Sequence, residues 1–272
     1  SKFFPEFQKY INEERYQLAK NQKIKETIPI ITETNNQASI EGDFLNFGNY
    51  KALIISNSNY KYLNKIENAI NDGNKLKDIL ENKYNFDVTF LKNATREDIY
   101  FAFDNLRELK NTDNLLIYYA GHGIIDRDSK TGYWQPVDAR PNRRSQWISV
   151  ANIKEEIKAI KSNHILVIAD SCFSGTLTSR NDVKIINKDE FVRKALVNEY
   201  IKKKARLAIT SGREDQLVID KQDEQIFSPF AENIIKVLNS NEDQWLRSSD
   251  LFKKIQEKMY INYEQKPTYD AI

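Results

Sequence analysis

Short apolar runs that alternate with helical patterns limit the fold of this chain more than any other feature of its sequence. Runs of this length are typical of strands buried on both faces of a parallel sheet. We therefore predict an α/β protein with a mostly parallel central sheet of about six strands and helices on both faces. We expect strands at residues 52–55, 86–91, 115–120, 165–169 and 206–210, and a short strand and turn at residues 132–139.

The segments between the runs carry apolar residues at helical spacing. Thr95 and Asp98 have the pattern of a capping box, which predicts that a helix begins there. The alternation begins near residue 51, so we assign residues 48–272 to one domain and expect residues 1–47 to form an N-terminal helical extension and linker. A strap laid over the domain and a poorly ordered tail both fit this linker. The other helices are expected at residues 67–84, 149–160, 229–238 and 249–260.

The charge and cysteine content exclude several classes of protein. The 272 residues include 41 basic and 39 acidic side chains, and a net charge of +2 gives no reason to expect a nucleic-acid or membrane partner. The single cysteine cannot form an internal disulfide, so we expect a reducing compartment and a cytoplasmic protein. No apolar run approaches the roughly 18 residues that a membrane-spanning helix needs.

The single cysteine and one of the two histidines each follow an apolar run. Cys172 comes after residues 165–169, and His122 comes after residues 115–120. Ligands of parallel sheets bind beyond the carboxyl ends of the strands, so the two side chains are expected to meet there. An imidazole beside a thiol can take its proton and leave a nucleophilic thiolate. This placement predicts a cysteine peptidase, with the backbone N–H groups of Cys172 and Gly123 as candidate donors to the oxyanion.

A structural role is the alternative for each of these residues. An isolated cysteine is more often a small buried hydrophobic residue than a nucleophile, and an isolated histidine is more often structural. The joint placement of Cys172 and His122 at two strand ends favours the chemical role. Gly121 and Gly123 flank the histidine, and the missing side chains would let a peptide approach closely. His164 begins the nucleophile strand and is expected to be structural.

Two motifs resemble those of a known family. Tyr-Ala-Gly-His-Gly at residues 119–123 and Asp-Ser-Cys-Phe-Ser-Gly at 170–175 resemble the catalytic motifs of caspase-like peptidases, in the metacaspase and bacterial orthocaspase branch. The resemblance runs from about residue 51 through residue 230 and implies a caspase-type fold. It also implies a catalytic dyad of His122 and Cys172 and an oxyanion hole that includes the Gly123 N–H. Phe173 departs from the pattern, since many metacaspases have histidine at this place.

The resemblance also implies a substrate preference. Metacaspases have an aspartate two residues before the nucleophile and another in the first helix, which match Asp170 and Asp72. Together these carboxylates grip arginine or lysine before the scissile bond. Two carboxylates favour a cation, and a guanidinium can bind them through two hydrogen bonds. We predict cleavage after Arg or Lys, with Arg preferred, and take Asp215 as a weaker third candidate. The alternatives are a strand-end cap or turn residue at 170 and an exposed helix acid at 72.

Regulation is less constrained by the sequence. The basic stretch at residues 176–204 is either a solvated loop and helix or a linker where the enzyme cuts itself after Arg or Lys. Many metacaspases are activated by calcium, but no EF-hand pattern is present. We therefore assign no cofactor and no metal ligand, and calcium activation stays open. Bacterial caspase-like domains commonly act as effectors that a sensor domain or partner protein switches on, so the resemblance implies a zymogen.

Two rival functions use the same residues. A caspase-like scaffold without activity could regulate a partner protein, but an intact pair of His122 and Cys172 argues against it. Another thiol hydrolase or transferase is the second rival. The sequence has no glycine-rich phosphate loop, zinc-ligand spacing or cofactor motif to support it.

Overall fold

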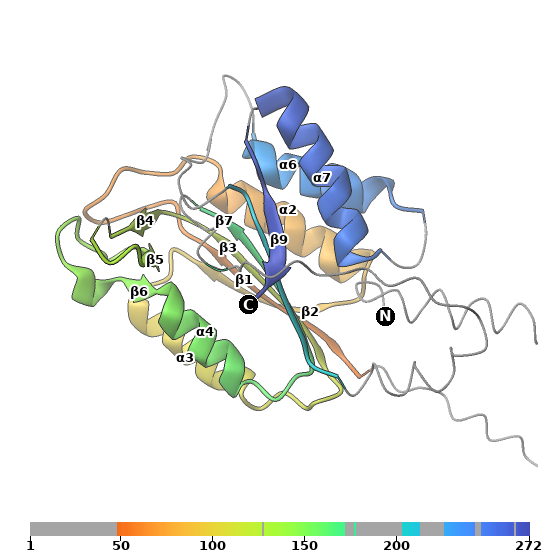
Figure 1. The fold of residues 1–272 in the computed structure, drawn as a ribbon, viewed down its shortest axis with the longest axis horizontal. Helices are drawn as coiled ribbons and strands as arrows, with labels where there is room; N and C mark the ends of the chain where they lie inside the picture. The colour runs from red at the N-terminus through yellow and green to blue at the C-terminus, as the bar shows by residue number, and fades with distance from the viewer. Residues whose placement is uncertain are drawn as a thin grey trace, which may run out of the picture.

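The computed structural model describes residues 48–126, 128–171, 177, 203–212, 226–242, 246–263 and 265–272. Within these ranges a six-stranded sheet forms the centre of the molecule (Figure 1). Its strands run parallel except for β9, which pairs antiparallel with β8 at one edge. In spatial order they are β2 (Asp87–Lys92), β1 (Tyr50–Ser56), β3 (Asn114–Ala120), β7 (His164–Asp170), β8 (Ala205–Thr210) and β9 (Thr268–Ala271).

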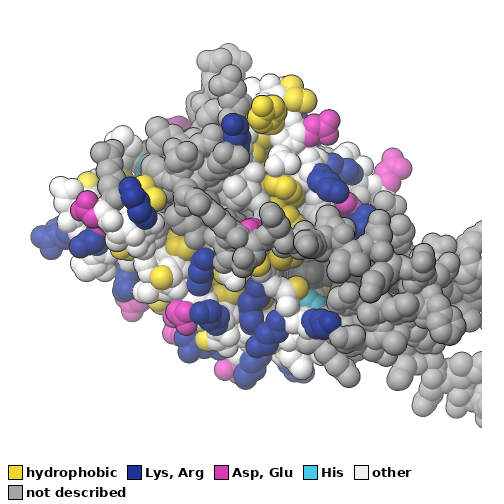
Figure 2. Space-filling model, viewed as in Figure 1, with side chains coloured by type: hydrophobic (Ala, Val, Ile, Leu, Met, Phe, Trp, Pro, Cys, Tyr) yellow, Lys and Arg dark blue, Asp and Glu magenta, His cyan; other side chains and the backbone are white. Residues whose placement is uncertain are grey.

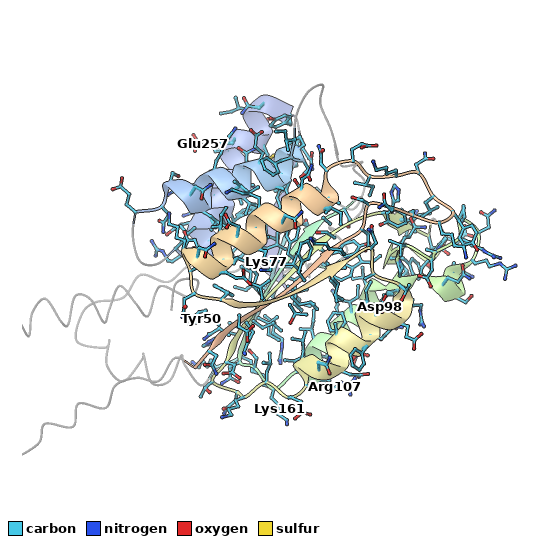
Figure 3. All side chains as sticks on the ribbon, turned by 180° about the vertical axis from the view of Figure 1, so that it is seen from behind. Tyr50, Lys77, Asp98, Arg107, Lys161 and Glu257 are labelled. Carbon is cyan, nitrogen blue, oxygen red and sulfur yellow. The ribbon has the colours of Figure 1, made fainter. Side chains whose placement is uncertain are left out.

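Helices cover both faces of this sheet, as predicted (Figure 1). Figure 3 shows Lys77 and Glu257 on one side of the sheet, and Asp98 and Arg107 on the other. One face carries α2 (Ala69–Asn82), α6 (Pro229–Ser240) and α7 (Ser248–Tyr263), and the other carries α3 (Arg96–Leu106) and α4 (Val150–Ala159).

The period-2 alternation of the strands divides the core into two layers. In β1, Ile54 packs in the layer under α2 and α6, whereas Leu53 and Ile55 pack in the layer over α3 and α4. All residues of β3 and β7 are buried. The complete burial of these two strands explains why they are continuous apolar runs in the sequence, and it makes them a rigid base for the residues that follow them.

The predicted helix start at Thr95 is confirmed. The Thr95 Oγ1 accepts a hydrogen bond from the Asp98 N–H (3.2 Å), and the Asp98 carboxylate accepts one from the Thr95 N–H (2.9 Å). The Thr95 hydroxyl also donates to the Asp98 carboxylate (2.7 Å), and this bond together with that of the Thr95 N–H lowers the pKa of Asp98.

Four short elements were not predicted. Two of them, β4 (Gly123–Ile125) and β6 (Ile148–Ser149), pair with the expected strand β5 (Gly132–Trp134) in a separate antiparallel sheet. The other two are the 3-10 helix η1 (Arg144–Gln146) and the edge strand β9. Each spans two to four residues. That is too short for a hydrophobic period to show.

The exposed surface carries charges of both signs. Figure 2 shows Lys and Arg side chains gathered near α3 and α4, with acidic side chains among them. The pairs there include Arg107 with Glu156 (2.6 Å) and Lys158 with Glu155 (2.6 Å), whose exposure limits their contribution to stability. Within the described ranges, every helix is too short or too polar to cross a membrane.

Candidate active site

The loops after β3 and β7 leave the sheet side by side. The two strands pair in parallel, with Ala120 opposite Asp170, and the Gly121 N–H donates to the Asp170 carbonyl (3.4 Å). His122 is the second residue after β3, so it lies at the carboxyl edge of the sheet, as predicted. Cys172 comes directly after Ser171 in the sequence but lies outside the described residues, as does Asp215.

One ring nitrogen of His122 is held by a backbone carbonyl. The Nε2 atom lies 2.8 Å from the carbonyl oxygen of Asn64, in the loop after β1. A carbonyl oxygen only accepts hydrogen bonds, so Nε2 must carry a proton in this contact. In the neutral imidazole the other nitrogen, Nδ1, is then the acceptor. The loop after β1 therefore selects a tautomer in which Nδ1 can take a proton.

Two tyrosines hold the backbone of His122. The Tyr60 hydroxyl accepts the His122 N–H (2.7 Å), and its ring lies 4.6 Å from the imidazole, tilted by 53°. Burial raises the pKa of Tyr60 well above its ordinary value, so its hydroxyl stays protonated. The fully buried Tyr119 donates its hydroxyl to the His122 carbonyl (2.8 Å). The peptide groups on both sides of the imidazole are thus fixed.

Gly121 is required by these two tyrosines. A Cβ atom at this position would lie 2.7 Å from the Tyr60 hydroxyl oxygen and 2.8 Å from that of Tyr119. Both distances are shorter than a carbon and an oxygen tolerate without a shift of the neighbours. We expected the glycine to admit a substrate peptide. The structure shows that the missing side chain leaves room for the hydroxyl groups of Tyr60 and Tyr119, which support His122.

The Gly123 backbone is oriented by the small sheet. Gly123 pairs with Trp134 of β5, and the Gln135 N–H donates to the His122 carbonyl (2.9 Å). Hydrogen-bonded and non-hydrogen-bonded pairs alternate along an antiparallel ladder, so Gly123 occupies a non-hydrogen-bonded position. Its N–H accordingly points away from β5 and takes no part in the hydrogen bonds of the small sheet.

The two predicted pocket carboxylates meet at one residue. Asp72, in the first turn of α2, is 1% exposed, and Asp170, at the end of β7, is 7% exposed. The Ser228 hydroxyl donates to Asp170 Oδ2 (2.6 Å), and the Ser228 N–H donates to Asp72 Oδ1 (3.1 Å) and Oδ2 (3.4 Å). We call Asp72, Asp170 and Ser228 the carboxylate pocket. The alternative of an exposed helix acid at position 72 is wrong.

His164 and the loop residue Asp126 have structural roles. His164 is buried, and its Nδ1 lies 3.1 Å from Asn114 Oδ1, as expected for a structural histidine. Asp126 accepts from the backbone of Ser129 (3.0 Å) and from the Arg144 guanidinium (2.6 Å), and these bonds lower its pKa. Among the described residues, no group of three His, Cys, Asp or Glu side chains is arranged to hold a metal ion.

Comparison with known proteins now identifies the family. Residues 49–271 match the family model of the caspase domain. The chain belongs to the caspase-domain family. The fold of this caspase domain is similar to the crystal structure of protein GSU0716 from Geobacter sulfurreducens, with a TM-score of 0.59 and 18% identity over 83% of this chain and 94% of that chain. At this identity the likeness establishes the fold alone. A comparison with curated protein sequences gave no match.

Sequence reasoning missed three supports of the caspase-domain site. Asn64 acts through its carbonyl oxygen, a group that every residue has, so no residue type could signal it. Tyr60 lies in a loop, and no periodic pattern in the sequence indicates that its ring contacts His122. Ser228 precedes Pro229, and a serine before a proline at the start of a helix indicates an N-cap. That signal predicts the cap but not the contact with two carboxylates.

Proposed function

We propose that this caspase domain is a cysteine endopeptidase that cleaves after Arg or Lys. In this proposal Cys172 is the nucleophile and His122 the general acid and base. The observation that carries the proposal is the carboxylate pocket, because a nearly fully buried aspartate at the end of β7, the strand that leads to Cys172, shares Ser228 with a second buried aspartate in α2. Buried carboxylates are costly unless a cation or hydrogen-bond donors compensate them. A substrate cation is the ligand that such a pocket suits.

The reaction follows from the tautomer of His122. Nδ1 takes the thiol proton, and the Cys172 thiolate forms a bond to the carbonyl carbon of the scissile peptide. The developing oxyanion accepts from the Gly123 N–H and from the Cys172 N–H. The C–N bond then breaks as the imidazolium gives its proton to the leaving amine, and a thioester remains. His122 next takes a proton from water, whose oxygen forms a bond to the thioester carbon. The C–S bond then breaks, the new acid is released, and the imidazolium proton returns to the Cys172 sulfur.

The contact with Asn64 assists both proton transfers. When Nδ1 is protonated, the imidazolium still donates from Nε2 to the Asn64 carbonyl, so the bond is kept and is strengthened by the charge. The ring therefore does not need to turn between the two halves of the reaction. Tyr60 and Tyr119 hold the backbone still during the same steps.

Specificity for basic residues is part of this proposal. Asp72 and Asp170 would bind the guanidinium or ammonium of the residue before the scissile bond, and Arg would be preferred because its fork can contact both carboxylates. Asp215 is proposed as a third contact. The proposal also includes a regulated effector whose activity awaits a sensor domain or partner protein, with self-cleavage within residues 176–204.

A peptide panel tests the proposal. Fluorogenic peptides with Arg, Lys or Asp before the bond are incubated with the wild-type protein and with Cys172→Ala, with and without calcium. We expect Arg peptides to be cleaved fastest, Lys peptides more slowly, and no turnover by Cys172→Ala. Faster cleavage of the Asp peptide would refute the specificity. If the folded protein cleaves no peptide in any condition, even when mixed with candidate partner proteins, the result would favour a caspase-like scaffold without activity.

A further inference from the structure

We propose that Ser228 is a positioning residue of the carboxylate pocket and that it sets the preference for Arg over Lys. It holds Asp72 and Asp170 at a fixed separation, so that one guanidinium can bind both carboxylates. This inference rests on the proposed function, because it assigns a role within the pocket for the residue before the scissile bond. Nothing in the two catalytic motifs points to Ser228, which lies far from them in the sequence.

The direction of each Ser228 hydrogen bond follows from the helix that it caps. Ser228 is the N-cap of α6, and its Oγ accepts from the Ala231 N–H (3.1 Å). An N–H group only donates, so the single hydroxyl proton is directed to Asp170 Oδ2 (2.6 Å). The Ser228 N–H donates to Asp72 (3.1 Å). One residue therefore supplies a donor to each of the two carboxylates.

The surroundings hold this arrangement in place. Ser228 is 2% exposed, and its side chain is fixed by the helix that follows it. The N-terminus of α6 also carries a partial positive charge, which favours negative groups beside it. Two buried carboxylates repel each other, and donors bound to each lower the free energy of keeping both charged. Ser228 thereby sets the geometry of the pocket before a substrate arrives.

This geometry matters more for arginine than for lysine. A guanidinium is a planar fork that gains its advantage only when both acceptors lie where its N–H groups point. A lysine ammonium is a compact charge with rotatable donors, so it tolerates a displaced carboxylate. Loss of the Ser228 hydroxyl should remove one hydrogen bond that holds Asp170 in place, while the backbone bond to Asp72 remains. The pocket would then still attract a cation but would no longer match the fork.

Ser228→Ala and Ser149→Ala form a matched pair for the test. Ser149 is the N-cap of α4, and its hydroxyl accepts from the Asn152 N–H at the same distance, 3.1 Å, but it touches neither pocket aspartate. Both variants remove a serine N-cap, so any effect of lost capping alone should appear in both. We expect only Ser228→Ala to raise the KM for an Arg peptide, by about tenfold, with kcat within about twofold. The KM for a Lys peptide should rise by about threefold.

Two further variants keep the result interpretable. Ser228→Thr keeps the hydroxyl and should restore the KM for Arg to within about threefold of wild type. Ser228→Gly keeps a good cap without the hydroxyl, so it should behave like Ser228→Ala even if the alanine variant fails to fold. Equal KM values in Ser228→Ala and Ser149→Ala would overturn the inference. So would a lower kcat at unchanged KM, or a threonine variant that is as weak as alanine.

A binding measurement separates this inference from the proposed function. Calorimetry of an uncleaved Arg peptide with Cys172→Ala reports on the pocket without turnover. If the wild-type protein cleaves nothing even when it is mixed with candidate partner proteins, the proposed function fails. The inference still holds if Cys172→Ala binds the peptide and the added Ser228→Ala change weakens binding by about tenfold. Absence of binding to folded Cys172→Ala, or equal binding by the two proteins, would overturn it.

Discussion

The two halves of the candidate active site are held in different ways. His122 is held through its peptide groups and one ring nitrogen, by partners from β3 and from the loop after β1. The pocket carboxylates come from α2 and β7, and both meet Ser228 at the start of α6. In the proposed function, the histidine half controls the proton that moves, and the pocket half controls the side chain that binds. Changes in the first half should act mainly on kcat, and changes in the second mainly on KM.

The largest effect is expected for the pocket aspartates. Asp170→Asn and Asp72→Asn keep the side-chain shape but remove a charge, and the loss of one partner from a buried charge pair costs roughly 2–5 kcal/mol. We expect kcat/KM for an Arg peptide to fall about a hundredfold or more, mostly through KM. Initial rates over a range of peptide concentrations measure the split.

A buried aspartate outside the pocket provides the control. Asp113 precedes β3 at the opposite end of the sheet, is 4% exposed, and accepts from the Asn49 N–H (3.1 Å). Asp113→Asn should lower the melting temperature but leave KM near the wild-type value. If it raised KM as much as Asp170→Asn did, the KM effect would reflect general loss of structure and the comparison would fail.

Tyr60→Phe tests the histidine half. The change removes the acceptor of the His122 N–H but keeps the ring against the imidazole. We expect kcat to fall about tenfold with KM within about twofold, since an unsatisfied N–H lets the loop shift. Tyr133→Phe is the control, because this nearby tyrosine packs its ring edge-on against Trp147 at 5.5 Å. A raised KM at unchanged kcat in Tyr60→Phe would reverse the assignment of the two halves.

Gly121→Ala should act on both halves through stability. The added Cβ would overlap the hydroxyl oxygens of Tyr60 and Tyr119, and overpacking of this kind costs about 1–3 kcal/mol. Urea unfolding measures the loss. Adding Tyr60→Phe removes one of the two close oxygen atoms, so the double variant should be more stable than the sum of the single changes predicts. Strict additivity would show that the overlap is relieved elsewhere.

The smallest effect is expected outside both halves, at the cap of α3. Thr95→Ala should cost about 1 kcal/mol of stability and leave kcat and KM unchanged. The Thr95 hydrogen bonds lower the folded-state pKa of Asp98 below its unfolded value. This contribution is therefore present above about pH 4 and is lost as the pH falls through the lowered pKa. The stability difference between wild type and Thr95→Ala should shrink in acid, and a constant difference would contradict the cap assignment.

Much of the fold could be predicted from the sequence because its central strands are buried on both faces. In β3 and β7 every side chain must be apolar or internally bonded, so each strand appears as a continuous apolar run. Strands β4, β6 and β9 could not be found in this way, since each is set by its neighbours and not by its own pattern.

The candidate site was predictable where it depends on side-chain identity at a strand end. His122 and Asp170 qualify, because both follow from the register of β3 and β7. A pocket position for Asp72 was implied by the family resemblance, but the helical pattern alone could not predict its burial, since the first turn of a helix is normally a solvated place for an acid. It is buried here because α6 begins against α2 and delivers the Ser228 N–H to it. Tertiary packing of two helices decided that position.

The order of the sheet has a consequence for biosynthesis. Strand β3, which leads to His122, becomes part of the site only after it pairs with β7. The chain that connects the two strands must be synthesised and folded first. Ser228 and α6 emerge later still from the ribosome. Under the proposed function, a peptidase for basic residues built in this way would stay inert until most of its domain has been synthesised. Its own nascent chain, with 41 Lys and Arg residues, would thereby be spared while it is still unfolded and open to cleavage.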